Sequence, residues 1–513
     1  MTERLSGVMP DWLRQQASSR PERPAVISAT ATQTFKQLDD SVDVMTKVLL
    51  AQGVQRGEFI ALLAASSALW VSAMYAVARA GCVLVPLNLR LADAELTWQL
   101  QDCGARRLLV DGANRWRGMA LAARLSMGSE ASSEALELNV IPLEELDVFA
   151  PNDSGSERTG ARFDLAATHS VLYTSGTTGR PKGALLTFGN HLWNATASAL
   201  NLGLMPDDRW LACLPLFHAG GLAIVWRSVI YGIPIVVHES FDPVRVNQAI
   251  DEEGVTIVSV VANTLQRMLD ERGVRPYPAS LRCVLLGGGP ASEPLLRRCV
   301  QLGVPVVQTY GLTETASQVV TLDPRDALRK IGSAGKPLFG TELRIVSDSG
   351  EECSPGAAGE IVVRGPSVTP GYLNRTEATA AALRDGWLHT GDIGCLDDDG
   401  YLYVLDRRDD LIVSGGENVY PAEVESVLES HADVREAGVY GRGDERWGQA
   451  VMAVVVPRAA ATTSPEELIA FCRERLAGYK TPIQVEFAAA LPRNAAGKLL
   501  RRALADRGSA TSN

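Results

Sequence analysis

The stretch Tyr173-Thr-Ser-Gly-Thr-Thr-Gly-Arg-Pro-Lys-Gly183 follows an apolar pair, Val171-Leu172, and carries the strongest chemical signal in the chain. Its three glycines allow the backbone to turn tightly and to point N–H groups at an anion. Its donors and turn residues are Thr174, Ser175, Gly176, Thr177, Thr178, Gly179 and Lys182. The stretch predicts a phosphate-binding loop, although its spacing differs from the common Gly-x-x-x-x-Gly-Lys-Ser/Thr loop. A flexible Ser/Gly linker is the alternative, but linkers rarely combine several threonines with a Pro-Lys pair between apolar strands.

The residues around this loop alternate between strand and helix patterns. Apolar runs such as Phe59-Ile-Ala-Leu-Leu, Thr256-Ile-Val-Ser-Val-Val and Cys283-Val-Leu-Leu are separated by helical patterns such as Ala92–Asp102 and Glu293–Leu302. This alternation predicts layered α/β units with largely parallel sheets. Beyond about residue 340 the runs alternate with Gly, Asp and Pro, and they predict a smaller β-rich unit over about 340–405.

The length of 513 residues is too great for one ordinary core. We expect a large N-terminal domain over residues 1–405, a hinge at 406–410, and a small mobile α+β domain over 411–513. The hinge is suggested by the charge cluster Asp406-Arg-Arg-Asp-Asp410, which precedes Gly415-Gly416 and a helix start at Pro421. A solvated charge run is the alternative. In the last domain we expect helices at 421–430 and 465–477 and strands at 434–440 and 450–456.

Composition and charge narrow the functional class. A formal net charge of −11 disfavours nucleic acids, which need a basic surface, and anionic membranes. The eight cysteines show no metal-binding or redox spacing, so we expect reduced thiols and a cytoplasmic protein. No signal peptide is expected at the start of the sequence. The uncharged stretch Phe59–Ala78 is long enough to span a bilayer, but it contains three serines and divides into a strand and a helix, so no membrane span is expected.

Two further segments suit a nucleotide. Gln308-Thr-Tyr-Gly-Leu-Thr-Glu-Thr315 follows an apolar pair, and within it Tyr310 offers a flat face for a purine while Glu314 offers oxygen to Mg²⁺. A plain β-turn is the alternative. Trp387-Leu-His-Thr-Gly-Asp392 ends on a carboxylate that could accept from two ribose hydroxyls. An aspartate that only supports a turn is the alternative.

These motifs, in this order, resemble the adenylate-forming superfamily of acyl-CoA synthetases, luciferases and peptide-synthetase adenylation domains. The resemblance runs along nearly the whole chain. It implies an ATP-dependent, AMP-forming acid–CoA ligase that uses Mg²⁺, passes through an acyl-adenylate, and takes coenzyme A as co-substrate. The 173–183 loop would then bind the β- and γ-phosphates of ATP.

The resemblance also implies roles for single residues. In the nucleotide segment, Tyr310 stacks on adenine, Gln308 replaces a usual Asn at the adenine edge, Thr309 and Gly311 flank them, Thr313 meets the α-phosphate, and Glu314 binds Mg²⁺. Asp392 and Arg407 hold the ribose, Asp409 is the hinge, and Gly415 and Gly416 line the coenzyme A tunnel. Lys498, in Leu491-Pro-Arg-Asn-Ala-Ala-Gly-Lys-Leu-Leu-Arg501, contacts the substrate carboxylate and the α-phosphate; without the resemblance it reads as a surface charge.

The acid is indicated by a second group of segments. His218, in Leu214-Pro-Leu-Phe-His-Ala-Gly-Gly221, flanks the acyl pocket in the family, although a lone histidine is more often structural. The glycines Gly287, Gly288 and Gly289 leave room for a flat aromatic acid, or else form a tight turn. Residues 216–232, 285–290, 313–322 and 404–410 resemble the branch of the superfamily that acts on 2-succinylbenzoate in menaquinone biosynthesis.

That branch implies a second substrate carboxylate, for which Arg227 is the candidate cation, and a pocket that includes Ser317 and Gln318. Alternatives are a ligase for another aromatic or fatty acid, an adenylation enzyme that loads a carrier in trans, and a non-catalytic protein on the same scaffold. The sequence leaves the oligomeric state open, a homodimer included.

The position of Lys498 generates a first prediction. Lys498→Ala abolishes adenylate formation from acid and ATP, because a fixed cation no longer opposes the charge that builds on phosphorus. Thioester formation from a supplied acyl-adenylate is largely spared. Stopped-flow assays of the two half-reactions measure this, and an equal loss in both contradicts it.

Overall fold

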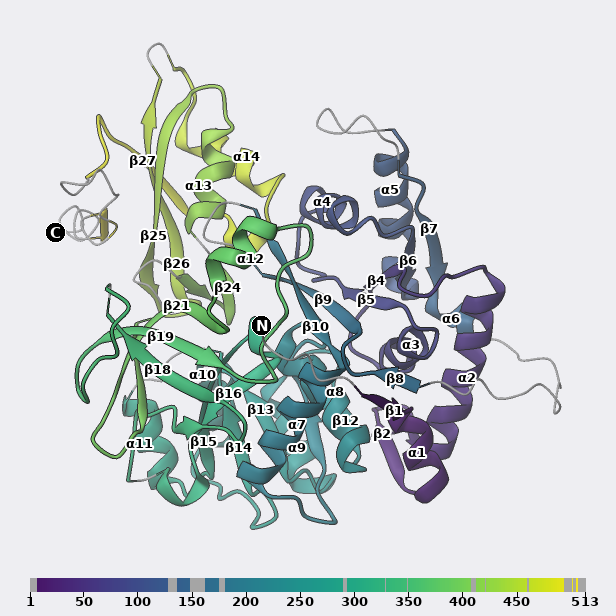
Figure 1. Ribbon diagram of the computed structural model, residues 1–513. Coiled ribbons are helices and arrows are strands. Elements are labelled where there is room, and N and C mark those ends of the chain that lie inside the picture. Colours follow the sequence, from purple (N-terminus) through teal and green to yellow (C-terminus); the bar gives the residue numbers. More distant parts are fainter. Residues whose placement is uncertain are drawn as a thin grey trace.

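The computed structural model describes residues 7–127, 136–147, 162–174, 180–288, 293–327, 329–347, 349–406, 412–419, 421–458, 461–492, 501 and 504–505. Figure 1 shows a large α/β body and a smaller α+β domain, with β25–β27, α13 and α14, that stands against one side of it. The α/β fold class with a large N-terminal and a small C-terminal domain is confirmed. The predicted positions of Ser175, Gly176, Thr177, Thr178, Gly179, Gly289, Arg407, Asp409 and Lys498 lie outside the described residues.

A six-stranded sheet carries the predicted phosphate loop. Its order is β10 (Lys182–Thr187), β9 (Thr168–Thr174), β5 (Val83–Pro86), β4 (Phe59–Leu63), β6 (Arg107–Val110) and β7 (Asn139–Pro142). All neighbours are parallel except β10, which runs antiparallel to β9. The associated helices are α2 (Phe35–Ala51), α3 (Ala68–Arg79), α4 (Asp93–Cys103), α5 (Arg115–Ser126) and α6 (Leu143–Asp147). The loop therefore joins the two strands at one edge of this sheet.

A nine-stranded sheet forms the other half of the body. Its order is β17 (Lys336–Pro337), β16 (Ser317–Thr321), β15 (Val306–Leu312), β14 (Cys283–Leu286), β13 (Ile257–Val260), β11 (Trp210–Ala212), β12 (Ile235–Val237), β2 (Pro24–Ile27) and β3 (Thr32–Thr34). Its helices include α7 (Phe188–Leu202), α8 (Ala219–Tyr231), α9 (Pro243–Glu252), α10 (Ala262–Arg272) and α11 (Glu293–Gln301). The central strands are parallel and buried, which explains their uniformly apolar sequences.

Two smaller sheets follow. The first contains β18 (Glu342–Val346), β19 (Gly359–Arg364), β20 (Leu383–Arg384), β21 (Trp387–Leu396) and β22 (Leu402–Asp406), with α12 (Thr376–Ala382) beside it. It occupies the stretch where a β-rich unit is expected. The second contains β23 (Ile412–Ser414), β24 (Glu417–Val419), β25 (Val434–Asp444), β26 (Gly448–Pro457) and β27 (Gln484–Phe487), with α13 (Pro421–Glu429) and α14 (Pro465–Arg473).

The expected helix at 465–477 is shorter than predicted, since α14 ends at Arg473. Its last turn tightens, because the Arg475 N–H donates to the Cys472 carbonyl three residues back, and a 3₁₀ turn at Gly478–Lys480 follows. This early end matters because it delivers Lys480 to the boundary with the body.

The stretch Phe59–Ala78 divides into β4 and α3, as its sequence predicts. Within the part of the chain that the structure describes, no helix combines the length and the apolar character that a membrane crossing requires.

A buried charge cluster holds α1 (Trp12–Ser19), α2 and α3 together. The Arg79 guanidinium on α3 contacts Asp11 at 2.7 Å, Asp39 at 2.5 Å and Asp43 at 2.8 Å. Burial alone would lower the pKa of Arg79, but Asp11 and Asp39 outweigh it and raise the pKa above its ordinary value. The cluster is stable only while the opposite charges stay together.

Arg79→Met therefore lowers the free energy of unfolding by about 3–5 kcal/mol, because it leaves buried carboxylates without their main partner. Urea unfolding followed by tryptophan fluorescence measures the loss. Lys36→Met is the matched control, since Lys36 forms an exposed pair with Asp40 on α2 and its loss costs at most about 0.5 kcal/mol. Similar unfolding midpoints for the two variants contradict the assignment.

Candidate active site

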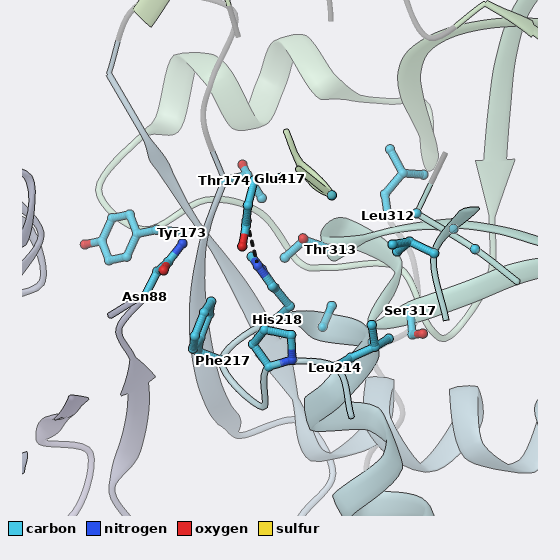
Figure 2. Close-up of a pocket in the computed structure, with 18 of the residues that line it drawn as sticks. Asn88, Tyr173, Thr174, Leu214, Phe217, His218, Leu312, Thr313, Ser317 and Glu417 are labelled. Carbon is cyan, nitrogen blue, oxygen red and sulfur yellow. Dashed lines mark hydrogen bonds and ion pairs between the residues drawn. The ribbon is translucent and has the colours of Figure 1, made fainter. Parts of the chain in front are cut away.

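One large cavity of about 1680 Å³ lies where the small domain meets the body. Its walls come from both large sheets, from the β-rich unit, and from the small domain. The predicted residues that it brings together are Thr174, Lys182, His218, Arg227, Gly287, Gly288, Thr309, Gly311, Thr313, Glu314, Ser317, Gln318, Asp392, Gly415 and Gly416. Figure 2 shows Thr174, Thr313 and Ser317 around the same space as His218.

The triphosphate side of the cavity combines one cation and one carboxylate. Lys182 begins β10, and Glu314 lies in the 3₁₀ turn Thr313–Thr315 after β15. Both side chains are half-buried, and both contact Tyr372: the Tyr372 hydroxyl donates to Glu314 Oε1 at 2.8 Å, and Lys182 Nζ lies 5.5 Å from the centre of the ring. Tyr372 therefore contacts both Lys182, the predicted phosphate-binding lysine, and Glu314, the predicted magnesium ligand.

The residues on this side fit a magnesium–ATP complex. Among the described residues, no cluster of three or more His, Cys, Asp and Glu side chains could hold a metal ion alone. Mg²⁺ does not need one, because it usually keeps several waters and takes one or two carboxylates together with substrate phosphates. Glu314, beside the hydroxyl of Thr313, provides such a partial ligand set.

The turn that presents Thr313 and Glu314 is closely packed. A Cβ at Gly311 would lie 1.8 Å from the Ser317 carbonyl oxygen, so only glycine fits where β15 and β16 lose their register. Ala316 and Ser317 have φ values of 55° and 125°, which non-glycine residues rarely adopt. Strained backbone of this kind concentrates at functional sites, where the surrounding structure enforces it.

The nucleoside side differs in part from the sequence interpretation. Asp392 lines the cavity, as expected for a ribose ligand. Tyr310, however, is buried and does not line it; its hydroxyl donates to Asp392 Oδ2 at 2.8 Å. Gln308 also lies outside the lining, and its side-chain N–H donates to the Ser333 carbonyl at 3.0 Å. Tyr310 thus holds the Asp392 carboxylate through a hydrogen bond without itself lining the cavity. The stacking of Tyr310 on adenine and the pairing of Gln308 with the adenine edge stay predictions.

The predicted acyl side of the cavity includes Gly287 and Gly288, at positions where a side chain would collide with its neighbours. A Cβ at Gly288, where φ is 78°, would lie 2.9 Å from Val261 Cγ1. A Cβ at Gly287 would lie 3.0 Å from Thr309 Cγ2. Both glycines therefore lie where the backbone is closely packed, and both line the cavity. Room for a flat aromatic acid beside them stays a prediction.

Arg227 lines the same cavity and is only 1% exposed. It donates to Asn194 Oδ1 at 2.7 Å and to Gln318 Oε1 at 2.9 Å, and it lies over the Trp210 ring. Both hydrogen-bond acceptors are neutral amides, and burial lowers the pKa of Arg227. Within the described residues, Arg227 Nε and Gln318 Nε2 are buried donors that lack an acceptor. This end of the cavity therefore favours a ligand with negative charge.

His218 contacts the small domain directly. Figure 2 shows His218 and Glu417 pointing toward one another, with His218 Nε2 3.1 Å from Glu417 Oε2. Arg90 of the body reaches the other oxygen of Glu417 at 2.9 Å. Burial raises the pKa of Glu417, but the opposing effects of His218, Arg90 and Lys480 are larger and hold it below its ordinary value. This buried carboxylate therefore links two basic groups of the body to the small domain.

A second charged contact crosses the same boundary. Lys480 is 3% exposed and contacts Glu423 of its own domain at 2.8 Å and Glu95 of the body at 2.7 Å. Burial lowers the pKa of Lys480, but Glu423 and Glu95 outweigh it and raise the pKa above its ordinary value. The small domain is thus fixed by two groups of buried charge, around Glu417 and around Lys480.

Sequence reasoning selected His218 but missed the other boundary residues and Tyr372. Glu417 had a usable signal, because it directly follows Gly415-Gly416 and an acidic residue beside a tight turn is well placed to contact a partner. Lys480, Glu95 and Tyr372 gave no comparable signal.

The fold and the cavity together define a two-domain nucleotide-dependent enzyme whose site is lined by both domains. The chain belongs to the AMP-binding enzyme family: the model of that family matches residues 13–373, and the model of its C-terminal domain matches residues 423–498. It is 50% identical over 497 residues to a 2-succinylbenzoate–CoA ligase of Geobacillus kaustophilus, with 97% of each chain covered.

Two solved structures of o-succinylbenzoate CoA synthetase from Bacillus subtilis are also similar, each at 44% identity. A double mutant bound to a product analogue gives a TM-score of 0.90, over 98% of this chain and 99% of the other. A complex with ATP and magnesium ion gives 0.73, over 97% and 99%. Identity and coverage are nearly equal for the two, so the chain as a whole superposes better on the product-analogue complex than on the ATP complex.

The Lys480–Glu95 contact generates the next prediction. Glu95→Gln keeps an acceptor for Lys480 but removes one buried charge, which weakens this arrangement of the domains. Thioester formation from a supplied acyl-adenylate falls by about three- to tenfold, as expected for losing one charged hydrogen bond. Adenylate formation is unchanged. Glu58→Gln is the matched control, since Glu58 pairs with Arg107 inside the body. Equal effects of the two variants on thioester formation contradict the prediction.

Proposed function

We propose that the chain is an ATP-dependent, AMP-forming acid–CoA ligase that converts 2-succinylbenzoate to its coenzyme A thioester in menaquinone biosynthesis. The observation that carries the proposal is one cavity that is lined by Lys182, Glu314 and Asp392, and also by a buried Arg227 without a carboxylate partner among the described residues. The named relatives act on this acid, and they match the chain along 97% of its length.

The reaction has two balanced steps. In the first, a carboxylate oxygen of the acid attacks the α-phosphorus of ATP, and pyrophosphate leaves as the acyl-adenylate forms. In the second, the thiol of coenzyme A attacks the acyl carbon, its proton is lost, and AMP leaves. Bound Mg²⁺ would neutralise the triphosphate charge, held in part by Glu314. Lys182 and Thr174 would orient the phosphates, Asp392 the ribose, and Lys498 the reacting carboxylate.

The two steps require different surroundings, and we propose that the small domain provides them by rotating about a hinge at 406–410, with Asp409 at its centre. In the arrangement described here, Gly415 and Gly416 line the cavity beside Glu417, a position suited to a narrow tunnel for the pantetheine arm. Neither glycine has a side chain to block it, and both have positive φ.

We also propose that the enzyme works in the cytoplasm, since all eight cysteines are free thiols and six are buried.

The second carboxylate of the acid is the feature that Arg227 would recognise. Burying a charge without a partner is expensive, so a site with a buried guanidinium selects ligands that supply the missing charge. A monoacid of similar shape leaves the Arg227 guanidinium without a carboxylate partner and binds more weakly. Gln318 and Ser317 would complete this end of the pocket.

A panel assay tests the proposal and its substrate. Pyrophosphate release is measured with 2-succinylbenzoate, benzoate and octanoate, each with and without coenzyme A, and the thioester is identified by mass. The expected preference for 2-succinylbenzoate is several hundredfold or more in kcat/KM.

Arg227→Gln lowers kcat/KM for 2-succinylbenzoate by about a hundredfold. It changes kcat/KM for benzoate by less than about threefold, because only the diacid has a second carboxylate that uses the Arg227 charge.

Arg272→Gln is the matched control, because Arg272 is equally buried but pairs with Asp251 away from the cavity. It should leave the preference unchanged. Equal turnover of octanoate and 2-succinylbenzoate removes the substrate assignment. Product formation that needs a carrier protein instead of coenzyme A removes the ligase assignment.

A further inference from the structure

The segment between β19 and α12, which contains Tyr372, is attached to the strand that carries Lys182. Tyr372 forms an antiparallel bridge with Ala184 of β10. On either side of it, the Leu185 N–H donates to the Gly371 carbonyl at 3.0 Å, and the Leu373 N–H donates to the Gly183 carbonyl at 2.8 Å. The backbone of Tyr372 is therefore fixed relative to β10.

The same segment is attached to the turn that carries Glu314. The Thr369 N–H donates to the Glu314 carbonyl at 2.7 Å, and the Tyr372 hydroxyl donates to the Glu314 carboxylate at 2.8 Å. One contact fixes the main chain of Glu314 and the other fixes its side chain, so the orientation of the carboxylate depends on Tyr372.

The ring of Tyr372 has a second contact, with Lys182. The Lys182 ammonium lies 5.5 Å from the ring centre, within the range in which the face of an aromatic ring attracts a cation. Lys182 is long and flexible, and this attraction restricts where its charge lies. Hydroxyl and ring therefore act on different groups, and their contributions can be separated by mutation.

We infer that Tyr372 is a positioning residue for the metal–triphosphate half of adenylation. Its hydroxyl orients Glu314 toward the magnesium ion, and its ring holds Lys182 for the phosphates. The inference rests on the proposed function, in which Glu314 and Lys182 have these roles. It follows a general pattern, in which carboxylates that bind metals are themselves held by hydrogen bonds and lose affinity when that support is removed.

Binding of a nucleotide analogue, without turnover, tests the inference. Calorimetry measures the affinity of the full-length protein for α,β-methylene-ATP in EDTA and at increasing Mg²⁺. Tyr372→Phe keeps the ring and removes the hydroxyl, so the Mg²⁺-dependent gain in affinity falls by about tenfold, as for one charged hydrogen bond. Affinity in EDTA stays within about twofold. Tyr372→Leu also weakens binding in EDTA, because Lys182 loses the ring.

Two controls separate positioning from simple loss of stability. Tyr401→Phe removes another tyrosine hydroxyl bonded to a carboxylate, that of Asp326, outside the cavity lining; its Mg²⁺ dependence should match the wild type. In a Glu314→Gln background, Tyr372→Phe should have no further effect on Mg²⁺ dependence, because its target carboxylate is gone.

An unchanged Mg²⁺ dependence in Tyr372→Phe overturns the inference, and so does an equal effect in both backgrounds. If Tyr372→Phe proves too unstable to measure, Glu314→Gln alone decides: the inference is overturned if the wild type and Glu314→Gln show the same Mg²⁺ dependence. Wild-type protein that binds the analogue with Mg²⁺ yet releases no pyrophosphate with any acid overturns the proposed function instead.

Discussion

The cavity depends on buried charges that meet across the boundary between the two domains. Lys480 and Glu417 belong to the small domain, and both are nearly inaccessible to water. Removing such groups from water is costly unless opposite charges compensate, and Glu95, Arg90 and His218 of the body provide part of that compensation. A partial rotation of the small domain would separate these charges without providing new partners. The domains should therefore occupy distinct arrangements instead of a continuous range.

This constraint explains how one cavity can serve a nucleotide, an acid and a thiol. The body contributes strand ends and turns that line the cavity, and these come from the large sheets. The small domain contributes a glycine turn and charged residues. The large sheets thus provide most of the cavity lining, and the small domain is held against them by a few buried charged contacts.

Much of this organisation was predictable from the sequence because it is local. The parallel strands are continuous apolar runs, and the phosphate loop, Glu314 and Asp392 each lie in a short segment whose residue types suit a ligand. Such segments gather at one place because strand ends of a sheet lie side by side. Gly288 was singled out from its glycine run, and the structure adds that a side chain at this position would collide with Val261.

The remaining parts of the site could not be predicted, because they depend on how distant segments meet. Lys480 and Glu95 are 385 residues apart, and neither has a neighbouring residue that indicates the other. Tyr310 is a different case: the sequence indicates its segment, but the packing of β15 against the β-rich unit buries its ring and directs its hydroxyl to Asp392. Its stacking on adenine stays a prediction. The position of a motif is encoded locally, whereas the direction of each side chain is decided by packing.

The acyl end of the cavity has a consequence for how this protein can evolve. Arg227 and Gln318 each keep a buried donor that has no acceptor among the described residues. Each such donor costs about 1–3 kcal/mol of folding stability. Substitutions that give these donors an acceptor within the protein would raise its stability. They would also remove the preference for a diacid that is proposed for this end of the cavity. Selection for higher stability and selection for ligand specificity therefore act in opposite directions at these two positions.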